Sequence, residues 1–320
     1  MNDINLTGLG VALATPFSNG DDRYGSGAVD LSAFRALVRS VIDGGADFIV
    51  VLGSTGEAAT VQEDERGALI RAALEEARDV PVVVGAGHNS TAGAVALAAG
   101  AARLGADALL VVTPYYNKPQ PAGLEAHFRA VAAAAPGLPL IAYNVPGRTG
   151  LNLTPAALAR LWTIPQVVAV KESSGNLAQI GEIARTLPPG KILLSGDDAL
   201  ALPSIALGAS GLISVVGNVV PAETKAMLSA ALSGDVATAR ALHAALLPLM
   251  DALFLETNPV PLKAALEIRG MATSAVRLPL VPASDATRAR LAEILAAYPD
   301  PAQAGSPDPS SVRGEARGAA

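Results

Sequence analysis

The feature that most constrains the fold of this chain is an eightfold alternation of short apolar runs with longer segments rich in Ala and Leu. The runs cover residues 9–15, 48–53, 80–85, 108–113, 138–144, 167–171, 191–196 and 211–217. Their nearly continuous Val, Ile and Leu character is typical of parallel strands buried on both faces. Eight strand–helix units within roughly 220 residues favour a (β/α)8 barrel, because closing the sheet leaves no strand edge exposed. The pattern alone leaves an open α/β sheet as the alternative.

The segment between the second and third runs shows how the intervening helices are predicted. Residues 60–78 place apolar side chains in one stripe at helical spacing. Thr60 is the expected N-cap, and Glu63 stands three residues later, where a capping box would place it. We therefore expect a helix directly after the polar residues that follow the second strand.

The pattern changes after the eighth run, where only helical signals remain. They cover residues 222–232, 236–254, 261–269 and 284–297. A barrel needs only one closing helix, so we expect the barrel over residues 1–220 and a small C-terminal α-helical subdomain over 221–298. Residues 299–320 are rich in Pro, Gly, Ser and Ala and hold few large apolar side chains, so we predict a disordered tail.

Composition excludes several classes of function. The chain has no cysteine, which rules out disulfides, zinc–thiolate sites and thiol nucleophiles. A net charge of -6 and an aromatic content of 3% oppose binding to nucleic acid. His88, His127 and His243 lack metal-ligand spacing, so we expect no metal. We find no uninterrupted apolar run of membrane-spanning length and no signal peptide, and we therefore predict a cytoplasmic protein without membrane contact.

Polar residues follow five of the predicted strands, and in a barrel of this kind the C-terminal strand ends surround one mouth. These strand ends, taken in chain order, are Gly53-Ser54-Thr55-Gly56-Glu57, Thr113-Pro114-Tyr115-Tyr116-Asn117, Tyr143-Asn144-Val145-Pro146-Gly147-Arg148-Thr149, Lys171-Glu172-Ser173-Ser174 and Ser195-Gly196-Asp197-Asp198. We expect the functional site among these side chains.

Lys171 is the most informative of these residues. It follows an apolar strand, which should leave its amine partly desolvated. Desolvation disfavours the ammonium form, and a free amine can attack a ketone to form an imine. The iminium withdraws electrons, so the neighbouring carbon loses a proton and becomes a nucleophilic enamine. The alternative is a lysine that reaches solvent or pairs with Glu172.

Hydroxyl groups are expected around this amine. Tyr143, Tyr116 and either Ser54 or Thr55 lie at the same predicted mouth. A chain of hydroxyls can carry protons to and from a carbinolamine oxygen. A tyrosine in such a place can also be a half-buried packing residue whose hydroxyl points to water.

Two further groups are suited to binding carboxylates. The backbone amides of Gly53–Gly56 directly precede a predicted helix, and helix N-termini attract anions. Arg148 lies in a Pro-Gly-Arg loop and offers a planar fork of donors. The alternatives are an ordinary strand–helix turn and a surface ion pair.

These motifs, in this order, resemble the dihydrodipicolinate synthase / N-acetylneuraminate lyase family. The resemblance runs from about residue 9 to about residue 282 and includes Thr257-Asn258-Pro259-Val260-Pro261-Leu262-Lys263. Within the family, the segment from Tyr143 to Thr149 resembles the synthase branch. The resemblance implies condensation of pyruvate with L-aspartate 4-semialdehyde to 4-hydroxy-tetrahydrodipicolinate, a step towards diaminopimelate and lysine.

The resemblance also implies roles for individual residues. Lys171 would form the Schiff base with pyruvate and no cofactor would be needed. Tyr143 would give and accept protons and orient the imine. Ser54 would relay protons between Tyr143 and Tyr116, and Tyr116 would come from a neighbouring subunit of a homotetramer built as a dimer of dimers.

The remaining implied roles concern substrate binding. Thr55 would hold the pyruvate carboxylate, Arg148 would hold the carboxylate of the semialdehyde, and Ile213 would present a backbone carbonyl near the imine. The family's synthases usually have Thr-Thr where this chain has Ser54-Thr55, and the same Ser-Thr pair also occurs in sialic-acid lyases. Serine keeps the hydroxyl that the relay needs.

Feedback by lysine is expected to be weak or absent. Lysine-sensitive members of the family use a histidine pair and a glutamate, and the matching positions here are Glu63, Arg66 and Gly93. Gly93 offers no acid for the α-ammonium of lysine, and Arg66 would repel its side chain.

Two other functions are weighed against the synthase. The first is a related pyruvate aldolase or dehydratase that acts on a sialic acid, 4-hydroxy-2-oxoglutarate or a 2-keto-3-deoxy sugar acid. Arg148 favours a small charged semialdehyde over a polyhydroxylated sugar. The second is a catalytically silent barrel that senses a 2-oxo acid, which the presence of Lys171 and of the hydroxyls opposes.

Overall fold

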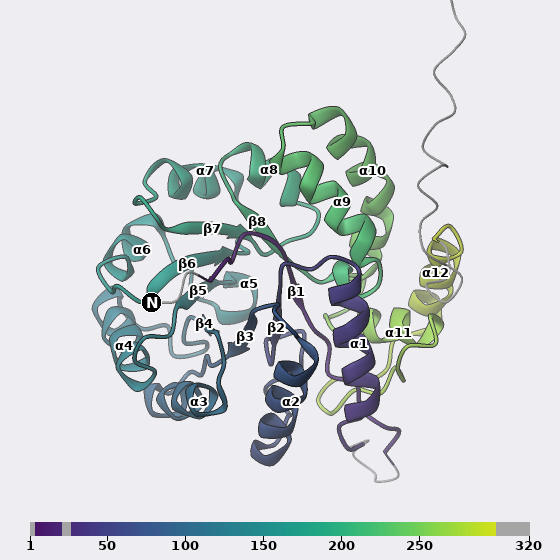
Figure 1. Ribbon diagram of the computed structural model, residues 1–320, viewed down its shortest axis with the longest axis horizontal. Helices are drawn as coiled ribbons and strands as arrows, with labels where there is room; N and C mark the ends of the chain where they lie inside the picture. Colours follow the sequence, from purple (N-terminus) through teal and green to yellow (C-terminus); the bar gives the residue numbers. More distant parts are fainter. Residues whose placement is uncertain (1–3, 21–26, 299–320) are drawn as a thin grey trace, which may run out of the picture.

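The computed structural model describes residues 4–20 and 27–298 and shows a closed barrel of eight parallel strands (Figure 1). The strands are β1 (Gly8–Ala12), β2 (Phe48–Val51), β3 (Val82–Gly85), β4 (Ala108–Val112), β5 (Leu140–Asn144), β6 (Val167–Glu172), β7 (Ile192–Ser195) and β8 (Gly211–Ser214). Each strand pairs with its neighbours in chain order, and β1 pairs with β8 to close the sheet. The predicted (β/α)8 barrel is confirmed, and the open sheet is excluded.

The barrel interior is filled by side chains from alternate strand positions. Phe48, Leu110, Ile141 and Leu194 are among its buried residues. Gly10 lies against the Phe48 ring, where an added methyl carbon would come within 2.2 Å of a ring atom. The barrel interior is therefore filled with side chains, and we look for the functional site at the C-terminal ends of the strands.

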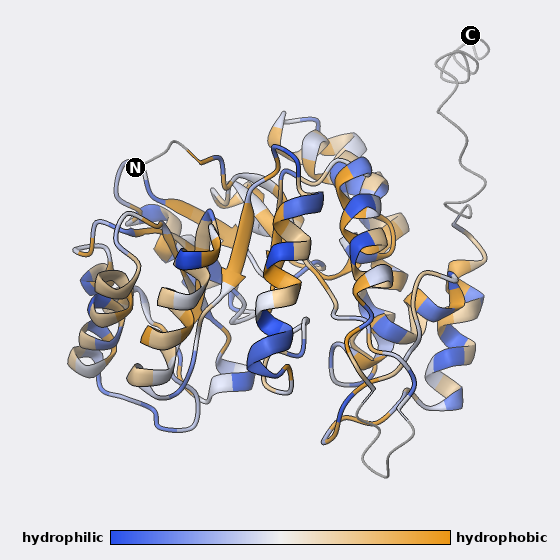
Figure 2. Ribbon diagram, turned by 60° about the horizontal axis from the view of Figure 1, so that its bottom comes forward, coloured by the Kyte–Doolittle hydropathy of each residue, from blue (hydrophilic) through white to orange (hydrophobic). Residues whose placement is uncertain are grey.

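Helices surround the barrel and bury a second, larger apolar layer against the outer face of the sheet. They are α1 (Leu31–Asp43), α2 (Glu63–Glu76), α3 (Thr91–Leu104), α4 (Pro121–Ala134), α5 (Pro146–Thr149), α6 (Pro155–Leu161), α7 (Leu177–Arg185) and α8 (Ala201–Ala206). Figure 2 shows hydrophobic strands at the centre and helices of mixed hydropathy around them. Among the described helices, none has the length and apolar character needed to span a bilayer.

The N-terminus of α2 differs from the prediction. The helix begins at Glu63, its N-cap is Gln62, and the capping box is formed by Gln62 with Glu65. Thr60 is therefore not the N-cap, and its hydroxyl instead donates to the carbonyl of Glu57 over 3.1 Å. The chain between β2 and α2 is a series of turns whose conformation depends on tertiary contacts. The spacing of apolar residues cannot predict such contacts, so it cannot predict the first residue of the helix.

Between β8 and residue 298, the regular elements are all helices. A short 3-10 turn, η1 (Val216–Asn218), leads to α9 (Pro221–Leu232), which packs against β1 and β8. It is followed by α10 (Val236–Ala252), α11 (Val260–Ile268) and α12 (Asp285–Leu295) (Figure 1). Residues 299–320, where a disordered tail was predicted, lie outside the described residues.

Candidate active site

Lys171 lies near the C-terminal end of β6 and is 4% exposed. β5 pairs with β6 so that Tyr143 stands opposite Lys171, and the lysine Nζ lies 4.3 Å from the centroid of the Tyr143 ring. Among the described residues, no ion pair involves Lys171. A buried amine without a counter-ion, next to a phenol, is suited to attack on a carbonyl.

Glu172 does not pair with Lys171, because successive side chains on a strand point to opposite faces. The Glu172 carboxylate accepts hydrogen bonds from Asn144 Nδ2 at 2.9 Å and from the backbone amide of Ser174 at 2.6 Å. These contacts tie the ends of β5 and β6 together on the outer side of the sheet. The alternative of a lysine paired with its neighbouring glutamate is therefore excluded.

Gly196 leaves the space that the end of Lys171 occupies. A methyl carbon added to Gly196 would come within 2.7 Å of Lys171 Cε and within 2.0 Å of Ser173 Oγ. The hydroxyl and the lysine thus flank the same point at the end of β7. Ser173 Oγ is shielded from solvent and has no hydrogen-bond partner, and the sequence prediction gave this residue no role.

A cavity of about 1010 Å³ opens at the barrel mouth and extends between α2 and α3. Ser54, Tyr143 and Arg148 line it, as the sequence predicted for a common mouth. Lys171 lies against the Tyr143 ring and does not itself line the cavity. Among the described residues, no hydrogen bond joins Tyr143 to Ser54. The two residues line the same cavity, but their hydroxyls do not form a hydrogen-bonded chain in this structure.

The loop that carries Ser54 and Thr55 presents unpaired backbone amides. The amides of Gly56 and Glu57 donate within the turn, to Gly53 O and Ser54 O. The amides of Ser54 and Thr55 have no partner within the part of the chain that the structure describes. The predicted location at a helix N-terminus is wrong, because α2 begins only at Glu63. Two adjacent free N–H groups still form a place suited to a carboxylate.

Asn258 joins the two predicted carboxylate-binding groups. Its side-chain Nδ2 donates to Thr55 Oγ1 at 3.0 Å, and its backbone carbonyl accepts from Arg148 Nη2 at 2.9 Å. Asn258 lines the cavity, and its Oδ1 is buried without a partner. The sequence prediction assigned Asn258 no role, because the residue follows the barrel and only tertiary folding brings it to the mouth.

Comparison with known proteins agrees with this geometry. Residues 5–298 match the dihydrodipicolinate synthetase family. The chain belongs to the dihydrodipicolinate synthetase family. The 4-hydroxy-tetrahydrodipicolinate synthase of Maridesulfovibrio salexigens is 46% identical over 290 residues, which cover 90% of this chain and 97% of that protein.

Solved structures of family members share the fold. The dihydrodipicolinate synthase of Aquifex aeolicus aligns with a TM-score of 0.87 at 42% identity and covers 92% of this chain and 98% of that one. A structure described as a monomeric dihydrodipicolinate synthase variant aligns with a TM-score of 0.87 at 40% identity, covering 91% of this chain and 96% of that one.

Tyr116 is placed differently from the other predicted residues of this family member. Its side chain is 86% exposed and does not line the cavity. Its backbone has a φ of 70°, in the left-handed region, and its amide donates to Thr149 O at 3.2 Å. Within one chain, Tyr116 therefore does not join the site of Lys171.

Ile213, the last of the predicted site residues, and the strand-end residue Asp198 are both buried. Ile213 is 1% exposed and packs in the barrel interior with Tyr143. Asp198 is buried, and its carboxylate accepts from the amides of Val215 and Val216, which secures the end of β8. Burial raises the pKa of Asp198. No group of three or more potential metal-ligating side chains is found among the described residues.

Proposed function

We propose that this protein is a 4-hydroxy-tetrahydrodipicolinate synthase in which Lys171 forms an imine with pyruvate. The observation that carries the proposal is a buried, unpaired lysine amine in contact with the Tyr143 ring, below a mouth that holds two groups suited to carboxylates. The curated relatives, which carry the same enzyme name, support it. The family's other pyruvate-dependent activities receive no such support.

The chemistry follows from the amine. Lys171 Nζ adds to C2 of pyruvate, and the carbinolamine loses water to give an iminium ion. Loss of a proton from C3 yields an enamine, which forms a carbon–carbon bond with the aldehyde carbon of L-aspartate 4-semialdehyde. The amino group of that substrate then attacks C2 and displaces Lys171, which closes the ring and frees the enzyme. The imine itself activates pyruvate, so the proposal needs no metal and no cofactor.

The polar groups of the mouth fit these steps. Tyr143, in contact with Lys171 and lining the cavity, is the proposed proton donor and acceptor, with Ser54 as its relay. The free amides of Ser54 and Thr55, with the Thr55 hydroxyl, would bind the pyruvate carboxylate. We assign the Ile213 carbonyl to the surroundings of the imine.

Arg148 is proposed to bind the carboxylate of the semialdehyde. Replacing Arg148 by Ala should lower kcat/KM for the semialdehyde about tenfold to a hundredfold, because a charge-assisted hydrogen bond is lost. Trapping of pyruvate on Lys171 should persist, since that step precedes the second substrate. Arg160→Ala removes an exposed arginine that pairs with Glu125 and serves as the control. An unchanged kcat/KM in Arg148→Ala would contradict the assignment.

The proposed reaction is tested by supplying pyruvate with L-aspartate 4-semialdehyde, and in parallel pyruvate with sugar-derived aldehydes. We expect turnover with the semialdehyde only. Turnover with N-acetylmannosamine or a glyceraldehyde instead would assign the protein to the aldolases. Trapping of pyruvate by borohydride without turnover of any aldehyde would indicate a sensor.

Tyr116 is proposed to complete the site of a second subunit. This tyrosine is 86% exposed, its backbone is in the left-handed region, and its amide bonds to Thr149 at the C-terminal end of α5. Pairing of two chains through this surface would exchange the tyrosines, and we propose a homotetramer built from two such dimers. One solved structure of the family is described as a monomeric dihydrodipicolinate synthase variant.

Inhibition by lysine is expected to be weak. Arg66 Nη2 donates to Gly85 O at 2.9 Å in the wall of the cavity, and a methyl carbon on Gly93 would come within 2.7 Å of the His88 ring. An acidic side chain at position 93 therefore has no space unless His88 moves. In a lysine titration of the synthase reaction, half-maximal inhibition below one millimolar would refute this expectation.

A further inference from the structure

The loop between β2 and α2 does not have a conformation that its own residues prefer. Leu52 has a φ of 57° and Glu57 a φ of 49°, both in the left-handed region that residues other than glycine rarely adopt. Ser54 and Thr55 lie between these two positions. Such a conformation persists only where surrounding contacts impose it. The contacts that hold this loop therefore determine the positions of Ser54 and Thr55.

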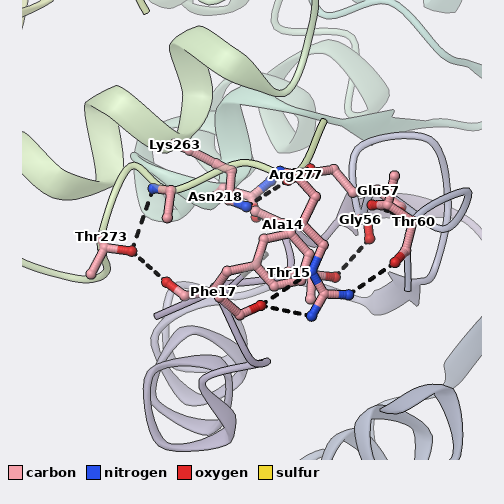
Figure 3. A network of polar contacts seen from close by, with 12 residues as sticks. Ala14, Thr15, Phe17, Gly56, Glu57, Thr60, Asn218, Lys263, Thr273 and Arg277 are labelled. Carbon is pink, nitrogen blue, oxygen red and sulfur yellow. Dashed lines mark hydrogen bonds and ion pairs between the residues drawn. The ribbon is translucent and has the colours of Figure 1, made fainter. Parts of the chain in front are cut away.

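Four contacts come from the helical region that follows the barrel. Lys263 Nζ on α11 donates to Glu57 Oε1 at 2.5 Å, and the backbone amide of Arg277 donates to Glu57 Oε2 at 3.3 Å. Arg277 Nη1 donates to Thr60 O at 2.9 Å, and Asn258 holds the Thr55 hydroxyl. Figure 3 shows Lys263 and Arg277 reaching from this region to Glu57 and Thr60.

The Glu57–Lys263 pair is the only ion pair among the described residues in which both side chains are fully buried, at 2% and 1% exposure. The Lys263 ammonium lies 4.0 Å from the centroid of the Phe17 ring, and the Arg277 guanidinium lies 4.2 Å from the same ring. Arg277 pairs with Glu65 at 2.6 Å. The cluster thus holds two anions and two cations.

Burial makes each member of this cluster depend on its partner. Desolvation lowers the pKa of Lys263 to about 8, although Glu57 acts in the opposite direction. A buried pair of this kind contributes little to stability compared with apolar residues, but removing one partner leaves a buried charge uncompensated. We therefore expect the Glu57–Lys263 pair to affect the conformation of the loop more than the net free energy of unfolding.

We propose that the Glu57–Lys263 pair is a positioning device through which α11 fixes the loop that binds the pyruvate carboxylate. The proposal rests on the proposed function. Neither residue touches substrate by this account: Glu57 lies on the wall of the cavity, but its carboxylate is occupied by Lys263 and Arg277, and Lys263 does not line the cavity. Both act through Ser54 and Thr55.

The test separates positioning from stability. Glu57→Gln keeps the shape but removes the charge, and Lys263→Met keeps an unbranched side chain without an ammonium. The double variant Glu57→Gln/Lys263→Met leaves no unpaired charge, so its Tm should return towards that of the wild type. We expect the KM for pyruvate to rise on the order of tenfold in all three variants, because the loop is no longer held. The KM for the semialdehyde should change little.

Glu267→Gln is the matched control. It removes the ion pair between α11 and Arg288 of α12, which does not contact the loop, so the KM for pyruvate should stay unchanged. Where a single variant fails to fold, the double variant decides. A double variant with recovered Tm and wild-type KM for pyruvate would overturn the proposal. The proposed function is tested separately, by the wild-type protein: absence of any turnover there would reject it. The variants test only whether the ion pair positions the loop.

Discussion

Replacing Lys171 by Met is expected to abolish both imine formation and turnover. The methionine preserves most of the packing against Tyr143 but has no amine, so no covalent intermediate can form. Turnover of pyruvate with the semialdehyde should fall by at least ~10⁴-fold, because every later step uses the iminium. Mass spectrometry after borohydride reduction should show one pyruvate per wild-type chain and none on Lys171→Met.

Lys191→Met provides the control for this experiment. Lys191 lies directly before β7, and its Nζ donates to Val167 O at the start of β6, at the opposite end of the barrel from Lys171. Trapping and turnover should stay close to those of the wild type. Persistence of the adduct in Lys171→Met, on whichever lysine it is found, would disprove the assignment of the imine.

Replacing Gly196 by Ala is expected to have the second largest effect. The new methyl carbon would come within 2.7 Å of Lys171 Cε and 2.0 Å of Ser173 Oγ, so the lysine must move. Misplacement of a reacting group by about 1 Å can cost about a hundredfold in rate, and we expect a loss of this size in kcat. The rate of borohydride trapping should fall in parallel, while circular dichroism stays unchanged.

Two further variants define the cause of this loss. Gly123→Ala adds the same methyl carbon on α4, where the nearest heavy atom is Cβ of Pro119 at 3.5 Å, and activity should be retained. Gly196→Ala combined with Ser173→Ala removes the closest contact and should recover part of the kcat. Full activity in Gly196→Ala would show that the amine is not confined at this point.

Much of the fold follows from local pattern. A strand buried on both faces needs apolar residues at every position, and such runs are visible in the sequence even without neighbours. The alternation of side chains along β6 also separates Lys171 from Glu172, once the strand is placed in a closed barrel. The convergence of Ser54, Tyr143 and Arg148 on one cavity was predictable because parallel strands end at one mouth.

Features that depend on distant contacts were not predictable. The start of α2 was placed at Thr60, because a polar residue before an apolar stripe resembles an N-cap, whereas Arg277 holds the Thr60 carbonyl outside the helix. The role of Asn258 arises from bonds to Thr55 and Arg148, which lie more than a hundred residues earlier in the chain. The spacing of apolar residues along the chain does not predict contacts between such distant residues.

The hydrogen bonds from the C-terminal region to the β2–α2 loop join segments that are far apart in the chain, so they can form only late in synthesis. Glu57 leaves the ribosome 206 residues before Lys263, and Thr55 leaves 203 residues before Asn258. Every strand of the barrel has been made by then, since β8 ends at Ser214. In the proposed function, a nascent chain therefore contains every strand and Lys171 before the residues that bond Thr55 and Glu57 have been made, and we expect it to bind pyruvate weakly until those contacts form.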